Sequence, residues 1–449
     1  MISYKEAQEI LLRHARPFGQ EKIGLEDAYG RVLAETIFAD RDYPPFNRSS
    51  MDGFAMRTGD LQKGIRRFTV VETIFAGATH TKPLGPGECY KIMTGAPVPD
   101  EADIVIRRED TVEGAVTIDL LPPPAPPFTP NLPAANPVQH PEPQHLANPA
   151  TPPPVHNHPV ANPDAPLAAN PPPTSSPNWR PFANIARKGE DLRSGSIVID
   201  RPAICEPAMM GLLASLGKKE VLVQRQPRVA LLTTGNEVVA VDAPVLPGQI
   251  RNSNRWLLQG FLQKNGLTPS LYAHLPDDIP AMRNALEKAL TADIIILTGG
   301  VSAGDADYVP GVLEELGVKR LFHKIAMKPG KPAWCGLAPG GGTVFALPGN
   351  PFSCLVGFVL LIQPFLDACR GLPVPQPLSL PLQTAKKKRT PLDEFFPVQP
   401  EGTPAGLRQM TLNGSGDIRM GLYASALALH PAEMGDLPVG SEVRYYSFV

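Results

Sequence analysis

Cysteine is scarce in this chain. The 449 residues include five cysteines, widely spaced and with no C-x-x-C pair among them. Neither a zinc site nor a disulfide framework is therefore indicated. We expect the cysteines to be reduced and mostly buried, which suits a cytoplasmic protein. They are Cys89, Cys205, Cys335, Cys354 and Cys369.

An excess charge of either sign is also missing. The chain has 42 basic and 44 acidic residues, for a net charge of -2. Nothing in this balance favours nucleic acid or an anionic membrane as a partner. With 43% hydrophobic residues the chain can bury large cores, and its length suggests about three domains.

No basic leader followed by an apolar run stands at the N-terminus, so we expect no secretory signal. Ser3 and Glu6 instead form a capping-box pattern that predicts a helix through Leu12. The longest apolar run, Cys354 to Ile362, is too short to span a bilayer and predicts a buried helix.

One segment differs from the rest in composition. Residues 121–181 hold 22 of the 54 prolines, and their only basic residue is Arg180. Such a stretch buries too little apolar surface to offset its ordering entropy, which predicts a disordered or polyproline-like insertion. Its P-x-x-P patterns could dock a partner, although a solvated linker is the favoured interpretation. Its irregularly spaced histidines have no cysteine beside them, so we expect no metal there.

Short strands alternate with turns over residues 40–120. From residue 228 onward, apolar strands alternate with helices, which predicts a parallel sheet covered on both faces. Residues 371–449 return to short alternating runs and predict a small β domain. The predicted strands of the α/β region are Val229–Leu232, Leu271–His274, Ile294–Leu297 and Val344–Leu347, and its helices begin near Asn254, Asp278, Pro310 and Pro351.

Three glycine-containing loops follow strands of this α/β region: Thr233–Glu237, Thr298–Tyr308 and Leu347–Pro351. Ligands of parallel sheets lie beyond the carboxyl ends of the strands, where free N–H groups at helix starts favour phosphate. A single loop of this kind most simply serves a tight turn. Three on one edge of a sheet favour a binding site.

Acidic residues recur at the same edge: Glu237, Asp277, Asp305 and Asp307. Clustered carboxylates suit a hard cation such as Mg²⁺ that bridges phosphates, although any one alone is more often a helix cap. We expect the neighbouring Asp278 to be such a cap.

Three lysines lie within eight residues, at Lys324, Lys328 and Lys331, among glycine and proline. They predict either a fixed cationic loop for an oxyanion or a solvated surface loop, and spacing alone does not decide between them. Residue spacing indicates no chemical mechanism for two further motifs, Pro45–Ala55 and Arg187–Asp191.

Seven motifs in order carry a resemblance. They are Ser49–Ala55, Ile92–Pro99, Arg187–Asp191, Thr234–Glu237, Thr298–Ser302 with Asp305–Tyr308, Lys328–Pro332 and Leu347–Pro351. Together they resemble the molybdopterin molybdenumtransferase family, which includes the C-terminal domain of gephyrin. The resemblance covers nearly the whole chain except the insertion. Each motif alone is weak, but seven in order are specific.

The resemblance implies a multidomain α/β protein that dimerises, with a central parallel-sheet α/β molybdopterin-binding domain. The other parts would be a mixed helix/strand part, an inserted mostly-β part and a small C-terminal β domain. The implied boundaries are 1–39 with 192–223 for the mixed part, 40–191 for the inserted part, 224–370 for the α/β domain and 371–449 for the C-terminal domain.

The implied reaction takes adenylylated molybdopterin and molybdate, and yields molybdenum cofactor and AMP with a divalent cation such as Mg²⁺. The upstream adenylyltransferase is an implied possible partner. Catalytic roles fall on Asp52, Asp191, Asp307, Lys324 and Lys328, and metal binding on Asp277 and Asp307. The residues implied to bind the pterin substrate are Thr94, Thr234, Gly235, Glu237, Gly299, Gly300, Ser302, Pro348 and Gly349.

In the family, the active site lies where the α/β domain of one subunit meets the inserted part of the other. Asp52, Thr94 and Asp191 would then come from one subunit and the remaining residues from its partner. The lysines would balance the charge of molybdate and phosphate. Asp277 and Asp307 would hold the cation, and Asp52 and Asp191 would position water or the cation.

The chain departs from the family pattern in two places. The proline-rich insertion replaces a short connection. The stretch Gly416–Gly421 also lacks the His and Ser residues that members commonly carry, which leaves open whether the C-terminal domain contacts substrate. Two alternatives remain open: a molybdopterin adenylyltransferase, which would lack the regions around Asp52 and Asp191, and a non-catalytic scaffold of the same fold.

Overall fold

The computed structural model describes residues 1–122, 179–200, 202–301 and 308–448. They form two compact units, one made of Met1–Phe38 with Ile197–Val449 and the other of Ala39–Ser196. Ser302, Asp305, Asp307 and most of the predicted insertion lie outside the described residues.

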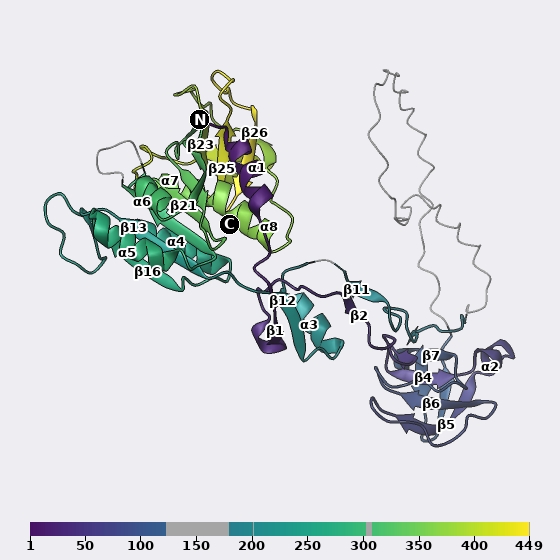
Figure 1. Cartoon of the computed structure of the whole chain (residues 1–449). Helices are drawn as coiled ribbons and strands as arrows, with labels where there is room; N and C mark the ends of the chain where they lie inside the picture. Colours follow the sequence, from purple (N-terminus) through teal and green to yellow (C-terminus); the bar gives the residue numbers. More distant parts are fainter. Residues whose placement is uncertain (123–178, 201, 302–307, 449) are drawn as a thin grey trace, which may run out of the picture. The chain divides into compact units, whose positions relative to one another are not determined.

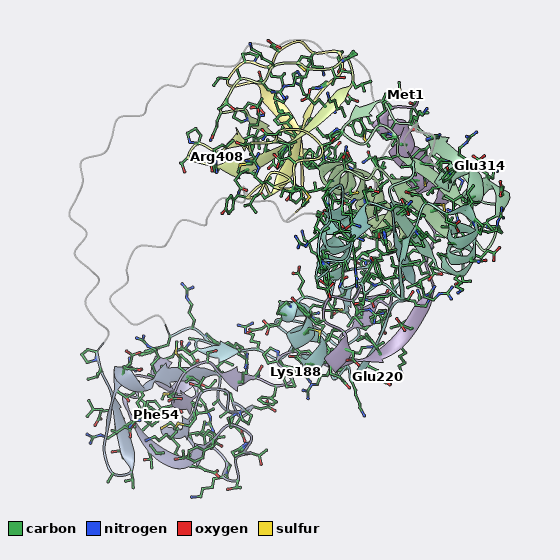
Figure 2. All side chains as sticks on the ribbon, turned by 90° about the vertical axis from the view of Figure 1, so that its left-hand side faces the viewer. Met1, Phe54, Lys188, Glu220, Glu314 and Arg408 are labelled. Carbon is green, nitrogen blue, oxygen red and sulfur yellow. The ribbon has the colours of Figure 1, made fainter. Side chains whose placement is uncertain are left out.

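The unit Ala39–Ser196 is built around a six-stranded sheet in the order β7-β4-β6-β5-β9-β8, and is mostly β as predicted. Phe54 packs in a core on one face, and Tyr90 packs in a second core on the other. Figure 2 shows Phe54 among these strands. The elements are β3 Arg48–Ser49, β4 Gly53–Met56, α2 Thr58–Gln62, β5 Arg67–Ile74, β6 Glu88–Ile92, β7 Ile104–Arg107, β8 Thr111–Glu113, β9 Thr117–Leu120 and β10 Ile185–Ala186.

The α/β region of the other unit has a six-stranded sheet in the order β16-β13-β17-β21-β20-β18 (Figure 1). Its strands are β13 Val229–Thr234, β16 Leu271–Leu275, β17 Ile294–Thr298, β18 Lys319–His323, β20 Trp334–Leu337 and β21 Thr343–Leu347. The first four in the sheet order are parallel, as predicted. The sequence analysis missed β20 and β18, which extend the sheet as antiparallel strands.

Helices cover both faces of this sheet, and its central strands β13, β17 and β21 are buried along their whole length. Along β17, Ile294 and Ile296 belong to one core, whereas Ile295 and Leu297 belong to the core on the opposite face. The first core includes residues of α4 Ser253–Lys264, α7 Pro351–Gly357 and α8 Gln363–Cys369. The second includes residues of α5 Ile279–Ala289 and α6 Val309–Glu315.

Local chemistry sets where the helices start. The Asp278 carboxylate caps α5 by accepting the N–H of Ala281 at 2.8 Å, which confirms its predicted role. The capping box of Ser3 and Glu6 likewise opens α1 Tyr4–His14. Proline occupies the first turn of α5, α6 and α7, where its missing N–H has no partner in any case.

The helical stretch Pro351–Cys369 includes a π-helical turn at Phe358–Ile362. Within the described part of the chain, it is the one helix long and apolar enough to cross a membrane, and 89% of the scored window is buried in the fold. This matches the predicted buried helix. All five cysteines are also buried and unpaired, as expected.

A second sheet forms the C-terminal β part, in the order β19-β23-β25-β26-β22 with β24 on β23. Its strands are β19 Met327–Lys328, β22 Leu378–Pro381, β23 Asp393–Glu401, β24 Gly406–Gln409, β25 Ala426–His430 and β26 Glu442–Ser447. Strand β19 comes from the lysine loop of the α/β region and pairs in parallel with β23. Helix α1 lies beside this sheet and α8, where Tyr4 meets Phe395 edge to face (Figure 1).

Three two-stranded sheets also belong to this unit, one of them the parallel pair of β14 Val238–Val239 with β15 Ile250–Arg251. The other two are antiparallel. β1 Gln20–Gly24 pairs with β12 Glu220–Gln224, and β2 Ile37–Phe38 pairs with β11 Ile197–Ile199. Helix α3 Pro207–Ser215 precedes β12.

Candidate functional site

The three predicted loops converge at the carboxyl edge of the parallel strands. They line one cavity of about 1380 Å³, which the C-terminal sheet also borders. Seven of the predicted binding residues line it: Thr234, Gly235, Glu237, Gly299, Gly300, Pro348 and Gly349.

Glycine is required in the second loop because the backbone is folded tightly onto its neighbours. Gly299 has φ +93°, and a Cβ there would lie 2.4 Å from Thr234 Oγ1. Gly300 has φ +67°, and a Cβ there would lie 2.7 Å from a methyl group of Val309. Both positions therefore disfavour any larger residue, and both glycines line the cavity.

Asn254 ties two of the loops together. Its side-chain amide donates to Thr298 Oγ1 at 2.8 Å and to the carbonyl of Gly349 at 2.6 Å, and its Oδ1 is buried without a partner within the described residues. Asn252 caps α4 and donates to Thr233 Oγ1 at 2.8 Å. The sequence analysis gave neither residue a role, although an asparagine pair at a helix start after a strand was visible in the sequence.

The third loop is fixed by a buried thiol. Cys354 donates to the carbonyl of Pro348 at 3.0 Å. Burial raises the pKa of this thiol to about 12, so the sulfur stays protonated and serves structure rather than nucleophilic chemistry.

Two carboxylates, Glu237 and Asp277, line the cavity on the side of the first loop. Asp277 and Asn236 hold each other: the Asn236 N–H donates to Asp277 Oδ2 and the Asp277 N–H donates to Asn236 Oδ1, both at 3.1 Å. Within the described residues, no three His, Cys, Asp or Glu side chains come together as a metal site.

Another part of the cavity wall is formed by the lysine loop. Lys328 and Lys331 are exposed and line the cavity. Lys324 is not among the lining residues. Its φ is +70° and its N–H donates to the carbonyl of Ala333 at 3.0 Å, so its backbone shapes the loop. The sequence analysis named Lys324 as a site residue. In the structure, Lys331 lines the cavity and Lys324 does not.

The C-terminal domain also contributes to the cavity wall. Asn350 donates to Ser415 Oγ at 2.9 Å, and the Phe352 N–H donates to the carbonyl of Ser415 at 3.1 Å. This contact brings Asn413–Gly416 and Ile418 to the cavity. In the stretch that departs from the family pattern, Asp417 is engaged locally with Arg419, whose guanidinium holds the pKa of that carboxyl far below its usual range.

In the unit Ala39–Ser196, the predicted residues Asp52 and Thr94 form one group. The N–H and hydroxyl of Thr94 donate to Asp52 Oδ1 at 2.7 and 2.8 Å, and these bonds lower the pKa of Asp52. Asp191 is exposed, and its N–H donates to the carbonyl of Tyr43 at 2.9 Å.

Two family models match this chain. Residues 230–368, which build the sheet and the three loops, match the model described as a probable molybdopterin binding domain. Residues 2–217 match the MoeA N-terminal region, domains I and II. The fold and the cavity thus define a multidomain protein built around a molybdopterin-binding domain.

The relatives agree over the whole chain. It is 30% identical over 454 residues to the molybdopterin molybdenumtransferase of Staphylococcus aureus strain Mu50, covering 98% of this chain and 94% of the relative. The enzyme of the same name from Staphylococcus epidermidis strain RP62A is 28% identical over 451 residues, with the same coverage. The chain therefore belongs to the molybdopterin molybdenumtransferase family, an enzyme family of molybdenum cofactor biosynthesis, as the seven motifs predicted.

Solved structures show the same fold. The molybdopterin biosynthesis moeA protein of Pyrococcus horikoshii OT3 is 27% identical, with a TM-score of 0.74 and coverage of 100% of both chains. A molybdenum cofactor biosynthesis protein of Pyrococcus furiosus, 18% identical with a TM-score of 0.53, shares the fold. The match of the N-terminal region disfavours the adenylyltransferase alternative, which would lack it.

Proposed function

We propose that this protein inserts molybdate into adenylylated molybdopterin, releasing AMP and forming molybdenum cofactor. The observation that carries the proposal is the cavity itself. Its three glycine-containing loops offer backbone groups together with the carboxylates Glu237 and Asp277, and its lysine loop offers Lys328 and Lys331. A substrate that carries phosphate groups and reacts with an oxyanion needs both sets of residues.

The roles follow from the chemistry of each wall. The backbone around Gly235, Gly299 and Gly349 would receive the phosphates, because glycine lets N–H groups approach closely. The lysines would balance the dianionic molybdate and the phosphate charge as preorganised clamps. Lys324 would act by shaping the loop, and Asp307 and Ser302 keep their proposed roles on the basis of the motif.

Mg²⁺ fits the residues at the first loop. Magnesium commonly takes one or two protein carboxylates and completes its shell with water and phosphate oxygens, so Asp277 and one further carboxylate suffice. Asp277 would hold it together with Asp307, and one oxygen of Asp277 is already fixed by the N–H of Asn236. When bound, the ion would neutralise phosphate charge and polarise the phosphoanhydride.

Purified protein supplied with adenylylated molybdopterin, molybdate and Mg²⁺ should release AMP and generate active cofactor. Folded protein that releases no AMP would favour the scaffold alternative. Repeating the assay with tungstate would measure the preference between two oxyanions of the same charge. We further propose a cytoplasmic location and a possible encounter with the upstream adenylyltransferase, which must supply the substrate.

We also propose that the protein is a homodimer whose cavity is completed by Asp52, Thr94 and Asp191 of the partner subunit. Mixing the inactive variants Asp52→Asn and Asp307→Asn tests this, because a mixed dimer then contains one site with both lesions and one with neither. Partial activity should return after subunit exchange. No recovery in proven heterodimers would place both residues in the same subunit's site.

A further inference from the structure

A row of ionisable side chains crosses the C-terminal sheet beside the cavity. Lys328 of β19 stands opposite Glu394 of β23, and Glu394 stands opposite His430 of β25. Side chains at paired positions of neighbouring strands share one face of a sheet, so these three are neighbours. Lys328 and Glu394 both line the cavity.

Only one of the two carboxylate oxygens of Glu394 has a hydrogen-bond donor within the described residues. Its Oε1 accepts from Lys386 Nζ at 2.6 Å, in a pair whose side chains are only 5% and 10% exposed. Its Oε2 is buried and has no partner within the described residues. A buried carboxylate oxygen without a donor is costly, so a donor is expected there.

The neighbours behind Glu394 do not supply that donor. His430 is fully buried, and its Nε2 donates to the carbonyl of Gly435 at 2.7 Å, which leaves Nδ1 as a second acceptor without a partner. Burial also lowers the pKa of His430, which favours the neutral ring. Lys388 donates its ammonium to the carbonyls of Leu392 and His430.

Lys328 is the remaining cation of the row. It is exposed to the cavity, it stands opposite Glu394 in the ladder, and it makes no ion pair within the described residues. Glu394 lines the same cavity, and the flexible stem of Lys328 can turn its ammonium toward this carboxylate, whose Oε2 has no donor within the described residues.

We propose that Glu394 is a positioning residue that clamps two lysines, Lys386 through Oε1 and Lys328 through Oε2. The clamp presents two ammonium groups to the cavity at a fixed separation around one carboxylate. That geometry suits a tetrahedral oxyanion, which two separately mobile lysines would bind with a larger loss of side-chain entropy. The inference rests on the proposed function in taking molybdate as the oxyanion, and it gives Lys386 and Glu394 a role in binding it.

The experiment compares three variants of the full chain. Glu394→Gln removes the clamp charge, and the double variant Lys386→Met with Glu394→Gln removes both buried charges, so that no buried lysine is left without its partner. Glu401→Gln is the matched control, since it makes the same chemical change on the same strand in an exposed ion pair with Arg408 (Figure 2). Thermal unfolding identifies any variant that fails to fold.

Molybdate alone is titrated into each protein by calorimetry, and the Michaelis constants for molybdate and for adenylylated molybdopterin are measured separately. Removing a group that orients binding residues typically costs about 10–100-fold, and we expect the folded double variant to bind molybdate that much more weakly. The Michaelis constant for the pterin substrate and the control should not change. Molybdate binding by the folded double variant as tight as in the wild type would overturn the clamp.

The two readouts separate this inference from the proposed function. Weaker molybdate binding in the double variant with no AMP release even from wild type would keep the clamp and reject the proposed activity. Normal AMP release with unchanged molybdate binding and an unchanged Michaelis constant for molybdate would reject the clamp and keep the activity.

Discussion

Replacing Asn254 by alanine should uncouple two loops of the cavity. The Asn254 amide is the donor that joins Thr298 at the end of β17 to Gly349 in the third loop. Both loops supply lining residues, so the position of one loop against the other shapes the cavity wall at Gly299 and Gly349. The side chain is buried, at 9% exposure, and water does not readily replace its bonds.

The magnitude follows from the two hydrogen bonds that are lost. Each contributes about 0.5–1.5 kcal/mol net, so Asn254→Ala should lower the free energy of unfolding by about 2 kcal/mol. The unpartnered Oδ1 of Asn254 is removed at the same time, which offsets a part of this loss. A displacement of about 1 Å in the substrate-holding loops should lower kcat/KM by about a hundredfold.

Asn265→Ala provides the control. Asn265 lies at the other end of the same helix and donates to the carbonyl of Phe261 at 2.9 Å and to Gln363 Oε1 at 2.8 Å, away from the cavity. Both variants should lose stability in denaturant unfolding, but only Asn254→Ala should lose AMP-releasing activity. Equal activity of the two variants would refute the claim that Asn254 sets the loops.

Three further predictions concern other parts of the chain. Asp307→Asn and Lys328→Ala should each lower the rate of AMP release by about a hundredfold in steady-state assays while leaving the protein folded, because each removes one preorganised charge. Thr94→Val should raise the pKa of Asp52 in an NMR titration, because it removes the hydroxyl donor. Since the folded-state pKa is depressed, the bonds to Asp52 stabilise the fold above the ordinary value of 3.8 and lose their effect as the pH falls through the folded-state pKa; an unchanged pKa would contradict this account. Replacing residues 123–178 with a short Gly/Ser linker should preserve both the melting temperature and the rate of AMP release, because loop-closure entropy changes by only about 0.6 kcal/mol per doubling of length. A large drop in the melting temperature would show that the segment packs against the folded part.

The parallel sheet could be predicted because the sequence signals for its strands are local. The continuous apolar runs at β13, β17 and β21 and the helix starts that follow them gave the parallel strands and the helices on both faces. The same order placed three loops on one edge, since parallel strands end on the same side. The four-part division of the chain stays a prediction.

The other wall of the cavity depends on contacts between distant residues. Glu394 stands opposite Lys328 only because the two-residue strand β19 joins the C-terminal sheet. The other strands of that sheet begin 50 residues later in the chain. Ser415 reaches Asn350 across 65 residues. A pattern in the lysine loop could not show that Lys331, rather than Lys324, lines the cavity, because the positive φ of Lys324 and its hydrogen bond to Ala333 appear only in the folded loop.

Strand β19 has a consequence for chimeric enzymes assembled from relatives. A cut near residue 371 would follow the covalent order of the domains, but it would separate β23 from the strand that pairs with Asp393 and Glu394. A transplanted C-terminal sheet would then meet a foreign lysine loop at the rim of the cavity. Grafts that carry Met327–Lys328 together with the C-terminal sheet should keep the native pairing of β19 with β23. Grafts cut only at the domain boundary should replace one of these two strands by a foreign one.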